Sequence, residues 1–231
     1  MKKTVQLFLL PYAGGSAFSF MKTTRFLDEK IEAIPIEYAG RGSRKNEPYI
    51  TTYAEFIDDV CGIIKLKRRQ ELPFSILGYS MGTALLFDIV SNEMMPEDPI
   101  HCFFCAGGSL IASDPSRMYS LLPTDEFRTR IINLGGIDDR ILQNENLLNE
   151  YLELIKADHN ILSQYKYNQK CISVSSTIIY NEDDPTCLNM EDWKKICCGH
   201  LNYFNIGNGH FFIHDHYRDL ADVINWSLFG G

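Results

Sequence analysis

Short apolar runs alternate along the chain with segments in which apolar residues recur every three or four positions. The runs predict β-strands, and the longer segments predict amphipathic helices. Regular alternation of this kind predicts an α/β fold, with a mostly parallel central sheet and helices on both of its faces. The predicted strands are residues 4–10, 31–37, 74–79, 100–106, 175–180 and 203–206, and the predicted helices are residues 18–29, 53–67, 83–90, 124–134, 146–165 and 215–228.

One segment breaks the alternation. Between residues 110 and 169 no strand pattern occurs, and helical patterns surround a turn at Gly135-Gly136. A stretch of about sixty residues is too long for an ordinary connection between two strands. We therefore expect a helical lid insertion at 110–169 within a single domain that spans residues 1–231. A helical excursion that packs elsewhere and has no gating role is the alternative.

Composition and charge restrict the classes of function. The 231 residues are 45% hydrophobic and 23% charged, and the formal net charge of −8 argues against general nucleic-acid binding. No apolar segment reaches the length of a membrane span. The apolar run after Met1-Lys2-Lys3 is too short for a secretory signal and is cut by Pro11. We therefore expect a cytoplasmic protein that does not enter a membrane.

The cysteines give no clear sign of a metal or redox site. There are seven, an odd number, and no metal-ligand spacing stands out among them. Cys102-x-x-Cys105 is the one candidate pair, but it lies in a buried-strand pattern, where residues three apart point to opposite faces. We therefore expect reduced core thiols, as in a cytoplasmic protein.

The segment Gly78-Tyr79-Ser80-Met81-Gly82 has the Gly-x-Ser-x-Gly pattern of a nucleophile elbow. It follows a predicted strand and precedes a predicted helix, which is the context that such an elbow needs. Glycine tolerates a sharp turn at which a Cβ would clash, and the N–H groups at a helix start favour negative charge. Ser80 is therefore the candidate nucleophile. A glycine-flanked serine in an ordinary loop is the alternative.

A serine hydroxyl needs a base to take its proton and a carboxylate to orient that base. In α/β-hydrolases the chain order is serine, acid, histidine. The predicted strand at 175–180 runs into Asp183-Asp184-Pro185, where we prefer Asp184 as the acid and keep Asp183 as the fallback. A solvated acidic turn is the alternative. His210, which follows a glycine-rich turn after the last predicted strand, is the candidate base.

The other histidines are weaker candidates for the base. His214 and His216 lie close to His210, and such a cluster could also hold a metal, but Gly209 disfavours the helix that ligands four residues apart require. We expect His101, in a predicted core strand, and His200, near a turn, to be structural. His159 precedes the acid and so does not fit the triad order.

Acyl transfer at a serine also needs two backbone N–H donors for the tetrahedral oxyanion. One is expected from Met81, directly after the candidate nucleophile, and the other from the loop Pro11-Tyr12-Ala13-Gly14-Gly15-Ser16 after the first strand. A phosphate-binding role for this loop is less favoured, because the loop lacks both the Gly-x-Gly-x-x-Gly spacing and a P-loop lysine.

Together these residues resemble those of the type II thioesterases, which are free-standing α/β-hydrolases that accompany nonribosomal peptide and polyketide synthases. The resemblance runs nearly end to end, includes the spacing of Ser80, Asp184 and His210, and makes Ala13 the second oxyanion donor. The other matching segments are Gly40-Arg41-Gly42-Ser43-Arg44, Leu122-Pro123, Leu134-Gly135-Gly136, Ala157-Asp158 with Tyr165, and Gly209-His210-Phe211-Phe212.

Two positions depart from the family pattern. Tyr79 stands before the nucleophile where histidine is usual, and Ala39 stands where proline usually precedes Gly-Arg-Gly. Tyr79 should not remove activity, because that side chain is outside the triad. It could change the packing against the pocket, and so the acyl preference.

The resemblance implies a thioesterase that hydrolyses acyl groups from the phosphopantetheine arm of carrier proteins, for editing or for product release. Ser80, Asp184 and His210 would form its triad, and Met81 and Ala13 its oxyanion hole. No cofactor and no metal are expected, because the phosphopantetheine belongs to the partner carrier domain, and we expect a monomer that binds no nucleic acid. A small-molecule carboxylesterase of the same fold and a non-catalytic carrier-binding protein are the alternatives.

Carrier domains of this kind are generally acidic. The basic run Lys65-Leu66-Lys67-Arg68-Arg69 is therefore a candidate docking patch. A solvated helix end is the favoured interpretation, because Lys and Arg are stabilising near a helix C-terminus.

Overall fold

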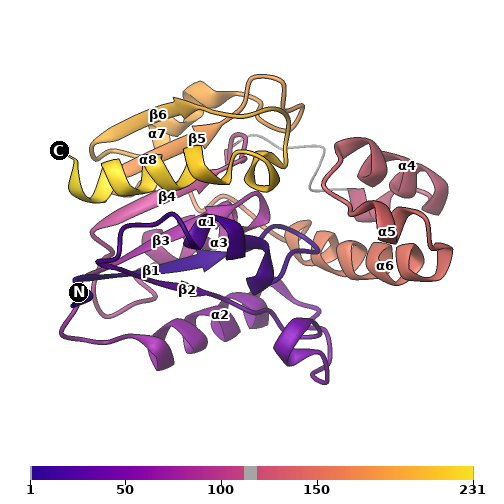
Figure 1. The fold of residues 1–231 in the computed structure, drawn as a ribbon, viewed down its shortest axis with the longest axis horizontal. Coiled ribbons are helices and arrows are strands. Elements are labelled where there is room, and N and C mark those ends of the chain that lie inside the picture. Colours follow the sequence, from indigo (N-terminus) through magenta and orange to yellow (C-terminus); the bar gives the residue numbers. More distant parts are fainter. Residues whose placement is uncertain (1, 112–118, 231) are drawn as a thin grey trace.

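Six parallel strands form one sheet in the computed structural model, which describes residues 2–111 and 119–230. Their order across the sheet is β2-β1-β3-β4-β5-β6, so the chain returns past β1 to place β3 on its other side (Figure 1). All six predicted strands and the predicted α/β class are confirmed. The strands are β1 (Val5–Leu10), β2 (Ile31–Pro35), β3 (Phe74–Tyr79), β4 (His101–Cys105), β5 (Ser176–Tyr180) and β6 (Leu201–Asn205).

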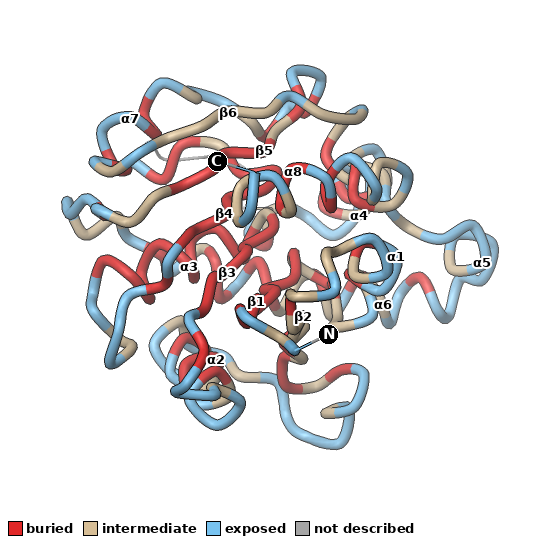
Figure 2. Tube along the Cα trace, turned by 60° about the vertical axis from the view of Figure 1, so that its left-hand side comes forward, coloured by how far each residue is buried: buried red, intermediate tan, exposed pale blue. Residues whose placement is uncertain are grey.

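Helices cover both faces of the sheet, as predicted. On one face lie α2 (Tyr53–Lys67), α3 (Met81–Ser91) and α7 (Trp193–Ile196), and on the other lie α1 (Met21–Thr24) and α8 (Tyr217–Phe229). The side-chain period of two divides each strand between the two cores. In β4, Cys102 packs into the first core and Cys105 into the second, so the two thiols point to opposite faces. Figure 2 shows the central strands buried between these layers.

Three helices of the predicted insertion lie together beyond the carboxyl ends of the strands (Figure 1). They are α4 (Thr124–Leu134), α5 (Asp139–Leu142) and α6 (Glu145–Leu162). The predicted turn after α4 is confirmed at Gly135 and Gly136, whose φ angles are 85° and 78°. Residues 112–118, near the start of the predicted insertion, lie outside the described residues. The helices share a small core of their own, made of Phe127, Ile131, Leu148, Leu152 and Ile155.

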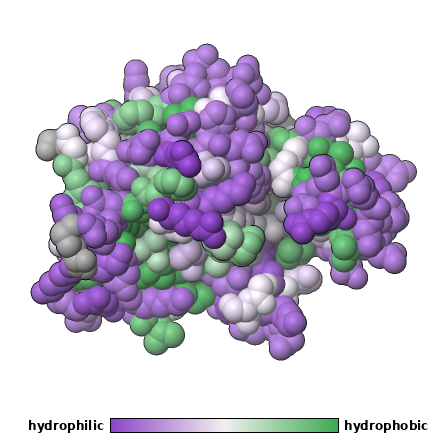
Figure 3. Space-filling model, viewed as in Figure 1, coloured by the Kyte–Doolittle hydropathy of each residue, from purple (hydrophilic) through white to green (hydrophobic). Residues whose placement is uncertain are grey.

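The face of the molecule in Figure 3 is mostly hydrophilic, with scattered hydrophobic patches. One such patch lies beside α4, where the insertion faces the rest of the molecule. Because α4 and α5 bury few side chains, the insertion is attached chiefly through α6, whose Ile161 and Leu162 join the core of the sheet.

The predicted helix at residues 18–29 is wrong in extent. A 3-10 turn, η1 (Ala17–Phe20), leads into α1, which ends at Thr24. The carboxylate of Asp28 accepts a hydrogen bond from the Lys30 N–H (2.8 Å), and the Asp28 N–H donates to Asn225 Oδ1 of α8 (2.8 Å). Local side-chain bonds to the backbone compete with a helix, which explains the early end.

The expectation that all cysteines are reduced is wrong for one pair. Cys171 and Cys198 are joined by a disulfide, with their Cα atoms 6.1 Å apart. Ile172 and Cys197 form a parallel β-bridge, which holds the two segments side by side and brings the neighbouring cysteines within bonding range. The tertiary bridge determines this pairing, and the separation of 27 residues did not suggest it. The other five cysteines, Cys61, Cys102, Cys105, Cys187 and Cys197, are not part of this disulfide.

The basic run after α2 is engaged in local contacts. Arg68 donates to the carbonyl of Leu72 (2.7 Å) and lies over the ring of Phe74, and Arg69 pairs with Glu71 (2.9 Å). Phe74 begins β3, so the run lies at the opposite end of that strand from Ser80. These contacts favour the helix-end interpretation over a docking patch. Within the described residues, no helix has both the length and the apolar character to cross a membrane.

Candidate active site

Ser80 occupies the turn between β3 and α3, with φ 51° and ψ −110°. A non-glycine residue in such a conformation costs about 1–3 kcal/mol and persists only where its surroundings hold it. The Ser80 N–H donates to the Cys105 carbonyl (2.7 Å), and the Thr83 hydroxyl donates to the Ser80 carbonyl (2.6 Å). At Gly78 a Cβ would collide with the Gly82 carbonyl. The predicted strand, sharp turn and helix around Ser80 are therefore present.

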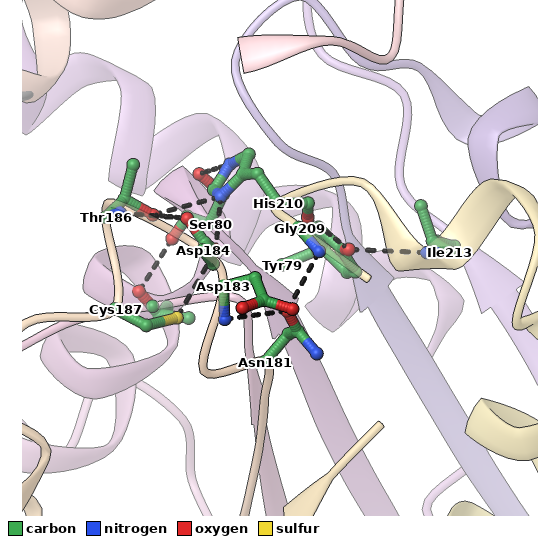
Figure 4. Close-up of polar contacts among 12 residues, drawn as sticks. Tyr79, Ser80, Asn181, Asp183, Asp184, Thr186, Cys187, Gly209, His210 and Ile213 are labelled. Atoms are coloured by element: carbon green, nitrogen blue, oxygen red, sulfur yellow. Dashed lines mark hydrogen bonds and ion pairs between the residues drawn. The ribbon is translucent and has the colours of Figure 1, made fainter. Parts of the chain in front are cut away.

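The structure brings together the three side chains that the sequence nominated. Ser80 Oγ lies 2.9 Å from His210 Nε2, and His210 Nδ1 lies 2.7 Å from Asp184 Oδ2 (Figure 4). They come from the segments after β3, β6 and β5, which meet at the carboxyl edge of the sheet. Asp184 and His210 are only 3% and 4% exposed, whereas the fallback acid Asp183 is exposed. The geometry agrees with the preference for Asp184.

The Asp184 carboxylate is held by more than the histidine. Thr186 donates to Asp184 Oδ1 from both its N–H and its hydroxyl (2.8 Å each), and the Cys187 thiol lies 3.3 Å from Oδ2. Burial disfavours the charged carboxylate, but the hydrogen bonds from His210 and Thr186 outweigh it, so the pKa of Asp184 is lowered. The aspartate is therefore ionised where it meets the imidazole. Thr186 was missed by the sequence reasoning, and no signal at this position marks it.

Asn181 joins the loop that carries the acid to the loop that carries the base. Its Oδ1 accepts from the N–H groups of Asp183 and Gly209 (2.9 Å each), and its Nδ2 donates to the Gly207 carbonyl (2.6 Å). Figure 4 shows Asn181 beneath the Asp184 turn and next to Gly209. The sequence reasoning missed this residue as well. Its place directly after β5 is the only signal for it.

Tyr79, which departs from the family pattern, also reaches the histidine loop. Its hydroxyl donates to the His210 carbonyl (2.7 Å) and lies 3.4 Å from the Ile213 N–H. The ring is fully buried, packed against Tyr12 and Phe212. Burial raises the pKa of Tyr79 well above its usual value, so the hydroxyl stays protonated as a donor.

Three of the remaining histidines have side-chain partners other than Ser80. His214 Nε2 lies 3.3 Å from the Tyr12 hydroxyl, and His216 pairs with Asp219 (2.9 Å). His101 Nε2 lies 2.8 Å from Thr177 Oγ1, and burial lowers the pKa of His101 to about 4, which agrees with a structural role. His200 is exposed near the turn before β6, and His159 is buried in α6. Over residues 2–111 and 119–230, no three His, Cys, Asp or Glu side chains are grouped as a metal site.

The two predicted oxyanion donors lie beside Ser80. Met81 begins α3, and Ala13 belongs to the loop after β1; both line the same cavity as Ser80. Within the described part of the chain, neither N–H has a hydrogen-bond partner. A helix start leaves its first N–H groups free, and a free N–H toward a cavity is available to a ligand oxygen.

A narrow cavity of about 60 Å³ opens on Ser80 and His210. Its walls are largely apolar and come in good part from the insertion, through Ile131, Leu134, Ile137, Ile155 and Leu162. A wider depression of about 790 Å³ lies outside it, between η1 and the turn after α4. The cavity and the depression share Tyr12, Leu134, Gly135, Ile137, His210 and Phe211.

A serine at a sharp strand-to-helix turn, facing a histidine that a buried carboxylate orients, can exchange its proton with the imidazole. The parallel sheet, the elbow after β3 and the order serine, acid, histidine define the α/β-hydrolase class. The thioesterase domain family matches residues 5–228, and the chain belongs to this family. The predicted thioesterase activity is confirmed.

Known relatives extend over nearly the whole chain. The gramicidin S biosynthesis protein GrsT of Aneurinibacillus migulanus is 24% identical over 95% of this chain and 87% of its own length. The structure of ClbQ from the colibactin NRPS/PKS pathway has a TM-score of 0.87, 24% identity, and coverage of 98% and 97% of the two chains. YbtT, a type II thioesterase from the yersiniabactin NRPS/PKS pathway, has a TM-score of 0.80, 18% identity, and coverage of 96% and 92%. The resemblance to type II thioesterases is confirmed.

Proposed function

We propose that this thioesterase hydrolyses acyl groups from the phosphopantetheine arm of carrier domains in a nonribosomal peptide or polyketide synthase. Ser80 is the nucleophile, His210 the general base and Asp184 the group that orients it. The observation that carries the proposal is the hydrogen-bonded chain from Ser80 through His210 to Asp184 at the end of a largely apolar cavity.

In the first half of the reaction, His210 Nε2 takes the hydroxyl proton as Ser80 Oγ attacks the thioester carbonyl. The tetrahedral oxyanion accepts hydrogen bonds from the N–H groups of Met81 and Ala13, and each such donor is worth about 10²–10³ in rate. The imidazolium that forms is stabilised by the ionised Asp184. Collapse of the intermediate breaks the carbon–sulfur bond, and His210 gives its proton to the departing sulfur, so the thiol arm leaves, an acyl-serine remains and the imidazole is neutral again.

In the second half, His210 takes a proton from water, and the resulting nucleophile attacks the acyl-serine. Collapse of the second tetrahedral intermediate returns the proton to Ser80 and releases the carboxylic acid. A thiolate leaves more readily than an alkoxide, but the His210 imidazolium can also protonate a departing alkoxide, so the same triad suits esters too. A small-molecule esterase is therefore the competing outcome in the test below.

The insertion supplies the acyl site and, in our proposal, acts as its lid. A cavity of about 60 Å³ accepts only a few water-sized spheres, which is too little for a long acyl chain. Ile131, Leu134 and Ile137 form part of its wall, on α4 and the segment that leads into α5. Outward movement of this part would enlarge the cavity toward the 790 Å³ depression, from which the arm would enter.

The test compares one acyl group in three forms. The kcat/KM for a hexanoyl thioester on a phosphopantetheinylated carrier domain is measured against that for ethyl hexanoate and for the hexanoyl thioester of N-acetylcysteamine. The proposal expects the carrier form to be preferred at least tenfold over the small thioester. Equal rates on all three, or a preference for the ester, would replace it with a small-molecule esterase.

A further inference from the structure

A buried ion pair joins the insertion to the segment after β2. Arg41 Nη1 and Nη2 contact Asp158 Oδ2 and Oδ1 at 2.5 and 2.6 Å, as two parallel hydrogen bonds. Arg41 lies directly before the 3-10 turn η2 (Gly42–Arg44), and Asp158 lies in α6. The two side chains are 5% and 1% exposed, so water does not screen them.

Both members of the pair also bind the loop that carries Ala13. Asp158 Oδ2 accepts from the Gly14 N–H at 2.7 Å, and Arg41 Nη1 donates to the Gly15 carbonyl at 3.2 Å. Gly14 has φ 78°, and a Cβ there would collide with Ile155 of α6. The loop therefore lies directly against α6, and the Asp158 carboxylate that binds the Arg41 guanidinium also holds the loop there.

Two further hydrogen bonds hold this loop. The Tyr38 hydroxyl donates to the Pro11 carbonyl (3.0 Å), and the Gly15 N–H donates to the Tyr12 carbonyl (2.8 Å). The backbone is thus held on both sides of Ala13. The Ala13 N–H, which has no partner within the described residues, borders the cavity at Ser80.

Stability alone does not explain such a pair. Taking two charges out of water costs about as much as their attraction returns, and apolar replacements of buried pairs are often neutral or stabilising. Burial disfavours the charge of Arg41, but Asp158 more than offsets it, so the pKa of Arg41 is raised and the guanidinium stays charged. A bidentate charged pair instead provides a defined geometry, because its two hydrogen bonds fix both the distance and the angle between the guanidinium and the carboxylate.

We propose that Arg41 and Asp158 are positioning residues for the oxyanion hole, which hold the Ala13 N–H toward the reacting carbonyl and couple helix α6 of the insertion to the chemical step. This role rests on the proposed function, since it matters only if Ser80 attacks an acyl group. It also divides the insertion, because α6 is tied to the catalytic loop while α4 and α5 bury few residues.

The first variant is Asp158→Asn. In either orientation of the amide, its NH₂ group faces a guanidinium N–H, so the bidentate contact is lost while side-chain size is kept. We expect kcat on hexanoyl-N-acetylcysteamine to fall by about tenfold to a hundredfold with KM changed less than twofold, because an oxyanion contact is made in the transition state. Rates are expressed per active site, counted by end-point labelling with a fluorophosphonate, so unfolded protein is not counted.

The matched control is Asp59→Asn. Asp59 also makes a bidentate pair, with Arg44 of the neighbouring turn (2.6 and 2.8 Å), but touches neither the Ala13 loop nor the cavity. Its kcat per labelled site should match wild type. Arg41→Lys is the second test variant, for use if Asp158→Asn fails to fold. It keeps the positive charge and loses only the paired hydrogen bonds of the guanidinium to Asp158. Its kcat should fall by about threefold to tenfold.

A trifluoromethyl ketone with a hexyl chain reports the oxyanion hole directly, because Ser80 adds to it and forms a tetrahedral oxyanion. Its inhibition constant should rise in Asp158→Asn by the same factor by which kcat falls, and stay at the wild-type value in Asp59→Asn. Wild-type kcat and inhibition in both Asp158→Asn and Arg41→Lys would overturn the positioning role. Turnover that survives in Ser80→Ala would instead overturn the proposed function.

Discussion

The loops at the carboxyl edge of the sheet and the helical insertion differ in how tightly hydrogen bonds and buried side chains hold them. Both carboxylate oxygens of Asp184 have hydrogen-bond partners, and the loops that carry Asp184 and His210 are held by further bonds from Thr186, Asn181 and Tyr79. In the insertion, α5 has no buried residue and α4 has two. The difference separates two tasks: chemistry requires fixed distances, whereas a site for acyl chains requires walls that can move.

Within the insertion itself the same division recurs. Helix α6 buries seven residues, including Asp158, and packs against the loop after β1. Helices α4 and α5 contact it mainly through a small apolar core. The insertion that the sequence suggested as one unit therefore consists of one helix, α6, that is anchored to the rest of the molecule, and two helices, α4 and α5, that are held less tightly.

Removing the nucleophile gives the largest expected effect. Ser80→Ala should lower kcat by about 10³-fold or more while leaving the melting temperature within a few degrees, because only the attacking atom is lost. Turnover of a hexanoyl thioester and thermal unfolding measure the two. Ser163→Ala, at the end of α6 and away from the cavity, is the control and should behave as wild type. Residual turnover within tenfold of wild type would mean that another group attacks.

A larger side chain in the cavity wall that the insertion provides should change acyl-chain selectivity without changing the catalytic steps. Leu134 lines both the cavity and the outer depression, so Leu134→Trp should lower kcat/KM for a decanoyl thioester about tenfold while that for the acetyl thioester changes less than twofold. Leu147→Trp, on α6 at a 46% exposed position outside the cavity, is the matched control. Equal losses for both chain lengths would show that Leu134 supports the triad instead.

Weakening a hydrogen bond that holds the His210 loop should lower kcat without changing acyl-chain selectivity. Tyr79→Phe removes the donor to the His210 carbonyl and leaves that buried group unpaired, at a cost of about 1–3 kcal/mol in the free energy of unfolding. We expect kcat to fall about fivefold, equally for short and long acyl chains, since the histidine loop is less well placed. Urea unfolding and steady-state rates provide the test. A chain-length-dependent loss would place Tyr79 among the selectivity residues.

Asp88, which lies near the end of the insertion, should make the free energy of unfolding depend on pH without affecting activity. Asp88 receives a hydrogen bond from Tyr53 (3.0 Å) and faces Asn168, where the chain returns from the insertion. Burial raises the pKa of Asp88 from 3.8 to about 6. An acid whose pKa is raised by folding lowers stability as pH climbs from its unfolded to its folded value.

Asp88→Asn should therefore be more stable than wild type by about 1–3 kcal/mol above pH 6, and the difference should vanish near pH 4. Urea unfolding at pH 4, 6 and 8 measures it, and kcat should be unchanged. A stability difference that is the same at pH 4 and pH 8 would show that Asp88 does not titrate in this range.

The sequence determined the strands, the elbow and the three side chains that we propose as the triad. Strands buried on both faces are continuous apolar runs, and parallel strands place their carboxyl ends on one edge, so Ser80, Asp184 and His210 could be assigned from local pattern and chain order. The helix at 18–29 was overextended because Asp28 forms its turn with a side chain of α8, a partner that local pattern does not contain.

Only the tertiary structure decided which distant residues hold the site. Arg41 meets Asp158 across 117 residues, Cys171 meets Cys198 through a β-bridge, and Tyr79 reaches the loop of His210. Each depends on how segments distant in the sequence pack against one another, and their spacing along the chain gives no period that sequence reasoning can use. Local pattern sets the elements and their order, because those rest on burial within a few residues; the partners that orient the chemistry follow from packing over the whole chain.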